Sequence, residues 1–588
     1  MLRSRASLIL LWFTLAGCVS IPFLTALHTY PIPTFYAEYA TGICWVALAV
    51  VMLVLTYGSR TGVPQIAWAP LALIVVLFVQ LQVAPPLNPF LSLAATIFLL
   101  ATVVTCALGA RARSLPGVLE TLAVGLIAGG LLTVAIEFVQ LFRIEHLPTM
   151  LFSINPTGTL RRMWGNLNQP NHAASYLAFG LAACAFLVSK CPRARAGVAV
   201  VALILLVGMS LTFSRTTWLH IIVVGGLTGL AWTVDQRGWR RWLMACVPIV
   251  LLVVAYQLCN WLIAYANTLW HLGLSPSMGD RMQEGTGLRT LLWKHAWHMF
   301  LAHPWLGGGW GDYAWNQYVQ TDVLGNVEMS MNAHNIVLDL LAKVGLLGLA
   351  AVALPAVGFV WGLRKRRMTP ALAFLLAIVL VLGAHSMLEY PLHYLYFLLL
   401  FAFVLGFADE RNFRMPSGSM TWTLMGVLSV FAAALMVQLW GDYRAVERLH
   451  YAPEGLPKEL ARYRERDASL LLPYETQAIA INWNVTQAMA GSLAKLELHA
   501  VQFYPGSTTV QRYALALAYL GKIDDAVLQV RRLHSQYWSE YAAQSWLLTQ
   551  ECGLDRAVLK AFCSRLQDEK LLVKEDKLPS KTSSPRSQ

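Results

Sequence analysis

Apolar stretches long enough to cross a membrane recur along most of this 588-residue chain, and they constrain its fold more than any other feature. A helix needs about 20 mostly apolar residues to span a bilayer, and it satisfies its own backbone hydrogen bonds in lipid. The sequence therefore predicts an all-α, polytopic helical membrane protein. About thirteen spans are expected, near residues 7–27, 35–56, 65–83, 89–109, 117–140, 172–189, 196–213, 217–233, 242–260, 344–362, 370–387, 392–407 and 419–440.

The composition excludes an ordinary water-soluble fold. Charged residues make up 13% of the chain, whereas a soluble globular protein has about 25%. The formal net charge of +13 comes mainly from Lys and Arg between the spans, so no nucleic-acid partner is needed to explain it.

The distribution of Lys and Arg predicts the orientation, because cytoplasmic connections are enriched in basic residues. Arg3 and Arg5 precede the first apolar stretch, as in a signal peptide, but no A-x-A-like cleavage site follows, which favours a retained span. We therefore expect a cytoplasmic N-terminus and place residues after 441 on the opposite side. The basic residues collect in every second connection, at 3–5, 60, 111–113, 190–195, 237–241, 364–367 and 411–414.

The C-terminal part has the composition of a helical domain outside the membrane. The stretch "YALALAYLGKIDDAVLQVRRL" (Tyr513 to Leu533) predicts a helical pair of the tetratricopeptide type. Cys552 and Cys563 could form a disulfide there if the compartment is oxidising, which the sequence leaves open. Five regions are expected: an N-terminal transmembrane bundle (1–260), a long outside loop (261–343), C-terminal transmembrane helices (344–440), an outside helical domain (441–575) and a disordered tail (576–588).

Arginines on the outer side are exceptions to the enrichment of basic residues in the cytoplasmic connections, and they are therefore candidates for a function. Arg215 stands in "LTFSRTTW", between two spans with almost no loop around it. It either reaches lipid headgroups or binds an anion at the membrane surface, for which a forked guanidinium suits phosphate. Arg289 begins an expected amphipathic helix in "LRTLLWKHAWHMFLAHPWLGGGWGDY", where Gly307 to Gly309 allow close backbone approach.

Two further stretches bring polar residues to the outer ends of spans. In "NAHNIVLDLLAKVGLLG", His334 precedes an apolar helix, and Asp339 and Lys343 are expected on its polar side at i, i+4. In "HSMLEYPLHYLYF", Glu389 and Tyr390 return to the outer surface. A lone histidine is more often structural than catalytic, but His334 lies where a helix enters the membrane, within the loop that also carries Arg289.

The stretch "GNLNQPNHAASYLAFG" (Gly165 to Gly180) places an unusual number of hydrogen-bonding groups at the start of a span. Pro170 can be the first residue of that helix. Asn168, Gln169, Asn171 and the helix N-terminus would then face bound sugar or phosphate. Simple capping by Asn is the alternative, but it does not require Gln169, Asn171 and His172 together.

These motifs, in this order, resemble the O-antigen ligase and polymerase superfamily of bacterial inner-membrane glycosyltransferases. The "NQPNH" segment is similar to that of the protein-targeting, PglL-type O-linked oligosaccharyltransferases. The resemblance implies transfer of a preassembled glycan from a polyprenyl (undecaprenyl) pyrophosphate carrier to Ser/Thr of a periplasmic protein or pilin. It also implies an inner-membrane location, with the long loop and the C-terminal domain in the periplasm, and needs no cofactor or metal.

The resemblance also implies roles for single residues. His334 would be the catalytic histidine, with Glu389 as a rival base or as its orienter. Arg215 and Arg289 would bind the donor pyrophosphate. Contact with the substrate is expected from Gln169, Asn168, Asn171, His172 and Tyr390. The sequence lacks HExxH, paired CxxC and DxD motifs, so no metal site is expected.

Three alternatives remain at this point. Within the superfamily, the chain could be a ligase onto lipid A core or an O-antigen polymerase, although "NQPNH" and the long C-terminal region favour a protein acceptor. A transporter or flippase would need charges near the bilayer midplane and two matching halves, neither of which the sequence has. A non-catalytic scaffold would leave the outer arginines unexplained.

Overall fold

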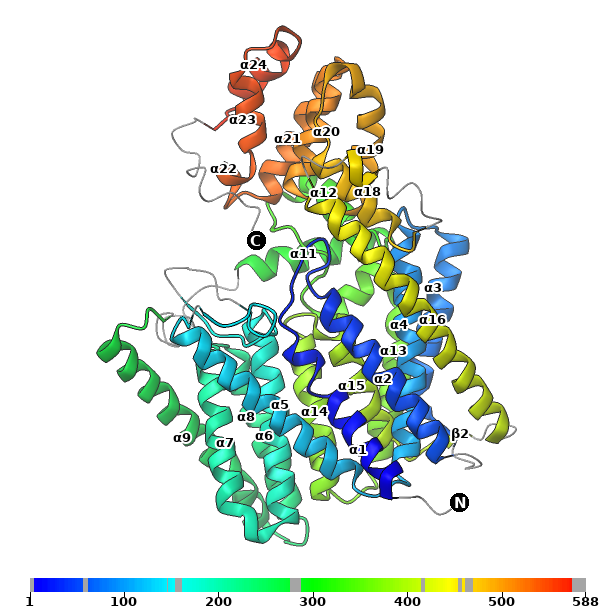
Figure 1. Cartoon of the computed structure of the whole chain (residues 1–588), viewed down its shortest axis with the longest axis vertical. Coiled ribbons are helices and arrows are strands. Elements are labelled where there is room, and N and C mark those ends of the chain that lie inside the picture. Colours follow the sequence, from blue (N-terminus) through cyan, green and yellow to red (C-terminus); the bar gives the residue numbers. More distant parts are fainter. Residues whose placement is uncertain are drawn as a thin grey trace. The chain divides into compact units, whose positions relative to one another are not determined.

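The protein is an all-α, polytopic membrane protein. The computed structural model describes residues 5–56, 62–144, 146–153, 161–274, 287–413, 418–452, 457–460 and 469–573. Helices dominate the described residues (Figure 1), and the strands β1 (Val63–Pro64) and β2 (Asn412–Phe413) form one short antiparallel pair. The expected disordered tail and the basic residues Arg3, Arg60 and Arg414 lie outside the described residues.

The helices fall into two compact units. The first comprises residues 1–74, 97–285 and 350–436, and the second comprises residues 75–96, 286–349 and 437–588. Helices of the first unit are α1 (Arg5–Cys18), α2 (Phe35–Leu55), α5 (Val118–Leu141), α6 (Pro170–Lys190), α7 (Arg195–Leu211), α8 (Thr216–Trp232), α9 (Trp239–Trp270), α14 (Pro370–Ser386) and α15 (Leu395–Ala408). Four helices contribute residues to both units: α3 (Trp68–Val83), α4 (Pro89–Ala112), α13 (Ile336–Leu363) and α16 (Gly418–His450).

Every expected span contains a helix, and nine helices of the described residues are long and apolar enough to cross a membrane. Four shorter apolar helices, α1, α8, α14 and α15, fall on the remaining expected spans. That all thirteen cross the bilayer stays a prediction.

Several helix ends differ from those expected. α1 ends at Cys18 rather than near residue 27, since Pro22 begins a short 3-10 helix (Pro22–Leu24) and proline disfavours helix continuation. α9 runs through residue 260 to Trp270, and α16 runs through residue 440 to His450. α13 begins at Ile336 rather than 344 and bends at Gly345, whose φ of 65° lies in the left-handed region.

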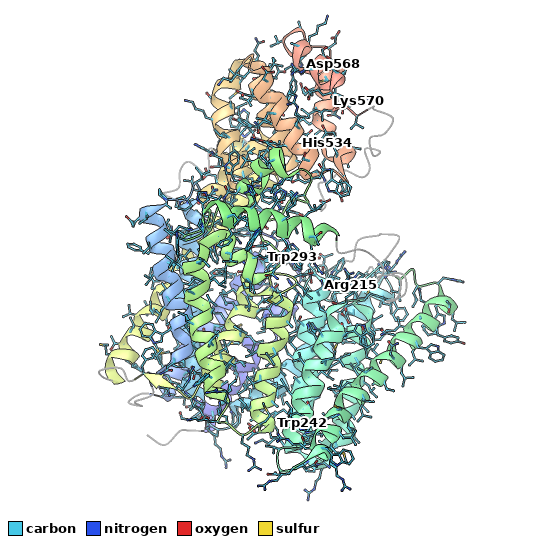
Figure 2. All side chains as sticks on the ribbon, turned by 180° about the vertical axis from the view of Figure 1, so that it is seen from behind. Arg215, Trp242, Trp293, His534, Asp568 and Lys570 are labelled. Carbon is cyan, nitrogen blue, oxygen red and sulfur yellow. A yellow bond between two sulfur atoms is a disulfide. The ribbon has the colours of Figure 1, made fainter. Side chains whose placement is uncertain are left out.

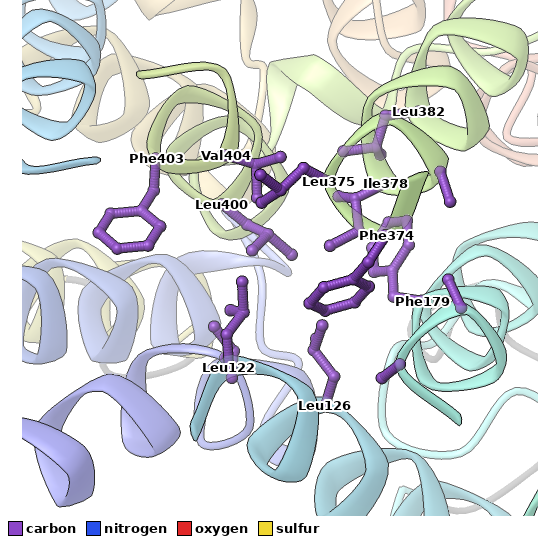
Figure 3. Packing of buried hydrophobic residues seen from close by; sticks show 14 of the residues in the cluster. Leu122, Leu126, Phe179, Phe374, Leu375, Ile378, Leu382, Leu400, Phe403 and Val404 are labelled. Atoms are coloured by element: carbon purple, nitrogen blue, oxygen red, sulfur yellow. The ribbon is translucent and has the colours of Figure 1, made fainter. Parts of the chain in front are cut away.

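Close helix contacts and interdigitated side chains hold the first unit together. Figure 3 shows Leu122 and Leu126 of α5 in one buried cluster with Phe179 of α6, Phe374 of α14 and Leu400 of α15. A Cβ on Gly109 of α4 would lie 2.1 Å from the carbonyl oxygen of Phe403, and one on Gly406 of α15 would lie 2.0 Å from that of Cys106. The backbones of α4 and α15 therefore touch, and small residues allow this in membranes, where packing rather than water exclusion drives association.

The second unit joins the long loop to the C-terminal helices in one core. The expected helical pair is present as α20 (Ser507–Tyr519) and α21 (Ile523–Gln536), which Leu520, Gly521 and Lys522 connect. Tyr318 of α12 (Tyr313–Leu324) is buried in this core and donates a 2.8 Å hydrogen bond to Gln529 of α21. Its other helices are α11 (Gly287–Ala302), α18 (Leu472–Asn482), α19 (Ala490–Phe503), α22 (Tyr541–Gln544), α23 (Trp546–Gly553) and α24 (Lys560–Asp568).

The two cysteines of the C-terminal region are joined. Cys552 at the end of α23 and Cys563 in α24 form a disulfide. The pairing that the sequence left open is therefore formed in the structure.

Candidate active site

The polar segment before α6 caps that helix with a glutamine. Pro170 is the first helical residue, as expected, and Gln169 is the residue before it. The Gln169 side-chain oxygen accepts a 2.6 Å hydrogen bond from the backbone N–H of His172, which satisfies one of the free donors of a helix start. Asn168 is exposed and has a left-handed φ of 53°. The cap is thus Gln169 and not an asparagine.

Glu389 is hydrogen-bonded to side-chain amides of the polar segment at the start of α6. Its carboxylate accepts hydrogen bonds from the side-chain amides of Gln169, at 2.6 Å, and of Asn171, at 2.5 Å. A third donor, Nε2 of His385, lies 3.4 Å away. Glu389 is 7% exposed, so protein donors replace water around a charge that would otherwise be costly to bury.

These contacts set the protonation state of Glu389. Burial by itself raises the pKa of its carboxyl group, but the hydrogen bonds from His385 and Asn171 and the electrostatic interactions with the His385 and His172 rings outweigh burial and lower the pKa to about 2. Glu389 is therefore held as an anion with its oxygens already engaged. Such a carboxylate is a poor proton acceptor.

The network continues to the segment that carries Arg215. The Asn171 side-chain oxygen accepts hydrogen bonds from Ser214 Oγ, at 2.5 Å, and from Arg162 Nη2, at 3.3 Å. Phe213, just before Ser214, has a left-handed φ of 47°, a strained conformation that recurs at functional sites. Arg215 follows immediately, and its side chain is partly exposed.

Arg215 lies directly before the N-terminus of α8, where free N–H groups and the helix dipole favour an anion. Figure 2 shows Arg215 at one end of the first unit's helices and Trp242 at the other end. Trp242 belongs to the start of α9, beside Arg240 and Arg241. Arg215 is thus separated from this basic end by the length of the helices.

His172 lies inside the network and not at its surface. It is 3% exposed, and its ring centroid lies 4.7 Å from that of Tyr394 and 5.5 Å from that of His385. Side-chain ligand atoms of His172, His385 and Glu389 lie within 4.8 Å of one another, a spacing that could hold a metal ion. Both Glu389 oxygens also accept hydrogen bonds from the side-chain amides of Gln169 and Asn171. Tyr390, next to Glu389, is partly exposed and stacks on Tyr394 with ring centroids 5.9 Å apart.

The second unit carries His334 on a strained, anchored loop. His334 has a left-handed φ of 53°, which is uncommon for a histidine. On one side, the N–H of Ala333 donates to Asp339 Oδ1 at 3.0 Å, and on the other, the Asn335 side chain accepts from the N–H groups of Val337 and Leu338. Because both neighbours are fixed, the loop can hold this backbone conformation.

A buried ion pair fixes the base of this loop. Lys343 Nζ lies 3.0 Å from Asp339 Oδ2, with side chains 4% and 3% exposed. Lys343 also donates to Asn332 Oδ1 at 2.5 Å and lies over the Trp310 and Tyr313 rings. The i, i+4 pair was expected on a polar helix side, and that placement was wrong: the aromatic rings cover it. The residues on either side of His334 are anchored by hydrogen bonds within the loop itself.

Arg289 lies in the first turn of α11 and is partly exposed. The glycine turn that follows α11 packs on the backbone of α13. A Cβ on Gly307 (φ 70°) would lie 2.3 Å from the Lys343 carbonyl carbon, and Gly308 N–H donates to the Ala342 carbonyl at 2.8 Å. The close approach expected of this turn is therefore confirmed. It ties the end of α11 to the helix that follows His334.

The structure thus brings four expected residues, Gln169, Asn171, His172 and Glu389, into one network of the first unit. Arg215 and Tyr390 adjoin members of this network in sequence, whereas Arg289 and His334 belong to the second unit. Sequence reasoning gave no role to further members of the network: His385, Ser214 and Arg162. His385 could have been found, since it stands four residues before Glu389, at the end of α14.

Comparison with known families connects these motifs. The model described as "Protein glycosylation ligase" matches residues 163–188, "O-Antigen ligase" matches residues 200–353, and "Virulence factor membrane-bound polymerase, C-terminal" matches residues 373–550. The chain belongs to the O-antigen ligase superfamily. Each model of this superfamily contains part of the site: Gln169 and Asn171 in the first, Arg215, Arg289 and His334 in the second, and Glu389 in the third.

Two relatives in the superfamily come from Acinetobacter baylyi (strain ATCC 33305 / BD413 / ADP1). A "General O-oligosaccharyltransferase" is 25% identical over 463 residues, which cover 74% of this chain and 76% of the relative. A "ComP-specific O-oligosaccharyltransferase" is 24% identical over 285 residues, which cover 47% of this chain and 48% of the relative. This chain therefore spans about half the length of the second relative. The resemblance to the PglL-type branch, predicted from the motifs, is confirmed.

Proposed function

We propose that this protein transfers a preassembled glycan from a polyprenyl pyrophosphate carrier to a Ser or Thr hydroxyl of a protein. The observation that carries the proposal is the double hydrogen bond from Gln169 and Asn171 to Glu389. It joins the segment matched by the protein glycosylation ligase model to the segment matched by the polymerase model. Both relatives are named O-oligosaccharyltransferases, which agrees with this proposal.

In the proposed reaction, the acceptor oxygen bonds to the anomeric carbon of the glycan while the bond from that carbon to the carrier pyrophosphate breaks. The electron pair of this bond leaves with the pyrophosphate, so negative charge grows on the bridging oxygen. Arg215 and Arg289 would stabilise that charge with fixed guanidinium groups, an electrostatic contribution of about 2.7–4 kcal/mol per donor in well-studied sites. Arg215 is aided by the N-terminus of α8.

The acceptor hydroxyl must lose its proton, and we assign this proton to His334. Glu389 was the rival base, but its three donors and its lowered pKa suit an anchor better than a base. His334 has an imidazole on an anchored loop next to the start of α13. We propose that Gln169 and Asn171 shape the donor site, each through the amide hydrogen that is not bonded to Glu389.

We further propose the bacterial inner membrane as the location, with the N-terminus cytoplasmic and the catalytic loop and C-terminal domain periplasmic. The alternating basic connections favour this orientation. The disulfide between Cys552 and Cys563 fits an oxidising compartment for the C-terminal domain. The carrier would be undecaprenyl pyrophosphate and the acceptor a pilin or another periplasmic protein.

A second candidate function is ligation onto lipid A core or glycan polymerisation. It is favoured by the match of residues 200–353 to the O-antigen ligase model and of residues 373–550 to the polymerase model. These two activities share the donor with the first proposal and differ in the acceptor. Identifying the molecule that receives the glycan therefore distinguishes the two proposals.

The test is reconstitution of the full chain into vesicles with a lipid-linked glycan and either a periplasmic acceptor protein or lipid A core. Transfer to the protein alone supports the first proposal, and transfer to lipid A core alone supports the second. His334→Ala should stop transfer but still bind the donor, since removing a general base costs about 10²–10⁴-fold in rate. Arg289→Ala should weaken donor binding as well. If His334→Ala turns over normally, the assignment of the base is wrong.

A further inference from the structure

A chain of buried polar side chains runs from Glu389 into the helix core of the first unit. His385 Nε2 lies 3.4 Å from Glu389 Oε2, and its Nδ1 lies 2.8 Å from Ser175 Oγ. Ser175 Oγ lies in turn 3.4 Å from Nε2 of His220. His385, Ser175 and His220 come from α14, α6 and α8, and each is 0% exposed. Polar groups among membrane helices are costly, so this alignment calls for an explanation.

With neutral imidazoles, the hydrogen bonds of this chain have one direction. The Glu389 carboxylate can only accept, so His385 Nε2 carries the proton and His385 Nδ1 accepts from the Ser175 hydroxyl. The Ser175 oxygen then accepts from His220 Nε2. The other nitrogen of His220, Nδ1, has no hydrogen-bond partner among the described residues, so the chain ends there. Each group fixes the tautomer or rotamer of the next one toward Glu389.

The order serine, histidine, carboxylate is also that of a nucleophilic triad. Ser175, however, is fully buried between α6, α8 and α14, and its hydroxyl points to two imidazoles. A nucleophile must meet its substrate, and this burial excludes the role. The chain therefore acts on Glu389 rather than on a substrate.

We propose that His385, Ser175 and His220 are positioning residues, which hold Glu389 and, through it, Gln169 and Asn171 in place for glycan transfer. This inference rests on the proposed function, because Glu389 affects transfer only through the groups that it binds. A displacement of about 1 Å in groups that orient a reaction can cost about 100-fold in rate. The carrier is bound mainly by the two arginines, so the loss should fall on kcat and leave the KM for the donor little changed.

Two variants of His385 separate the hydrogen bond from the ring. Gln at this position can place an amide nitrogen near the place of Nε2 and still donate to Glu389, whereas Leu fills space without a donor. We expect His385→Leu to lower kcat by about 10- to 100-fold, the range found when partners that orient functional groups are removed. His385→Gln should recover most of the lost turnover.

Two buried serines supply a matched control. Ser175 in α6 and Ser210 in α7 are 0% and 1% exposed, and the Ser210 hydroxyl has no hydrogen-bond partner among the described residues. Ser175→Ala and Ser210→Ala each remove one buried hydroxyl, but only Ser175→Ala interrupts the chain. Ser175→Ala should lower kcat by about tenfold, and Ser210→Ala should match wild type. Thermal unfolding midpoints show whether both variants fold alike.

The experiment measures single-turnover transfer and the donor KM in reconstituted vesicles for wild type and these four variants. The inference is supported if kcat falls most for His385→Leu, less for Ser175→Ala and not for Ser210→Ala, while folding is retained. If His385→Leu does not insert into the membrane, the comparison of Ser175→Ala with Ser210→Ala decides. Equal kcat for Ser175→Ala and Ser210→Ala would overturn it. Stoichiometric metal in wild type that is lost in His385→Gln would also overturn it, because the imidazole would then be a metal ligand. If wild type itself transfers no glycan, the proposed function fails instead.

Discussion

The hydrogen bond between Gln169 and Glu389 should appear as a large coupling energy. The amide nitrogen lies 2.6 Å from the carboxylate of Glu389, a residue that is 7% exposed, so water cannot replace the contact without rearrangement. A hydrogen bond to a charged group contributes about 1.5–3 kcal/mol to stability. We therefore expect Gln169→Ala and Glu389→Ala together to cost about 1.5–3 kcal/mol less than the sum of the two single changes.

The assay is a double-mutant cycle on the free energy of unfolding in mixed micelles. Gln169→Ala also removes the cap on the N–H of His172, which costs about 0.5–2 kcal/mol, but this loss occurs in both backgrounds and cancels. Asn168→Gly is the control, since Asn168 is exposed and its positive φ suits glycine. Its effect should add to that of Glu389→Ala within about 0.5 kcal/mol. Additivity within that margin for Gln169 as well would refute the network as described.

Three further outcomes are expected. Arg215→Lys and Arg289→Lys should each reduce glycosylated acceptor strongly at equal protein level in the membrane, because an ammonium group cannot replace a bidentate guanidinium; wild-type transfer by both would remove this role. Transfer should persist in excess chelator, and activity lost in EDTA but restored by Mg²⁺ or Mn²⁺ would reveal a metal site. Truncation after His450 should abolish transfer rather than change the choice of acceptor, because it uncovers Tyr318 and the rest of the α12 surface in the second unit; a truncated chain that still glycosylates would show that the C-terminal helices only select acceptors.

Apolar length alone was enough to predict the helices of the membrane region. Their ends were less predictable, because they depend on single residues. Pro22 ends α1 early and Gly345 bends α13, yet each lies within or at the edge of a stretch that is apolar enough to predict a continuous helix. The helical pair α20 and α21 was predictable because Gly521, with a φ of 76°, permits the tight turn between them.

Single residues of the candidate site could be singled out from the sequence, because their residue types suit the expected chemistry. The contacts that join distant segments could not. Gln169, Asn171 and Glu389 were each singled out, but their mutual hydrogen bonds span about 220 positions of sequence, with separations of 220 and 218 residues. The i, i+4 spacing of Asp339 and Lys343 predicted a polar helix side, because spacing alone does not show what covers a side chain. Ser175 looked like part of an apolar helix, and only the packing of α6 against α8 and α14 brings it to two histidines.

Intact-mass spectrometry tests most directly whether the glycan acceptor is a protein. Periplasmic proteins and pilins would be compared between a strain that lacks this protein and the same strain carrying wild type or His334→Ala. We predict that wild type adds the mass of one whole glycan at Ser or Thr, and that His334→Ala adds none at equal protein level. Unmodified proteins in all strains, with glycan restored on lipid A core by wild type, would contradict protein glycosylation and identify a lipid ligase.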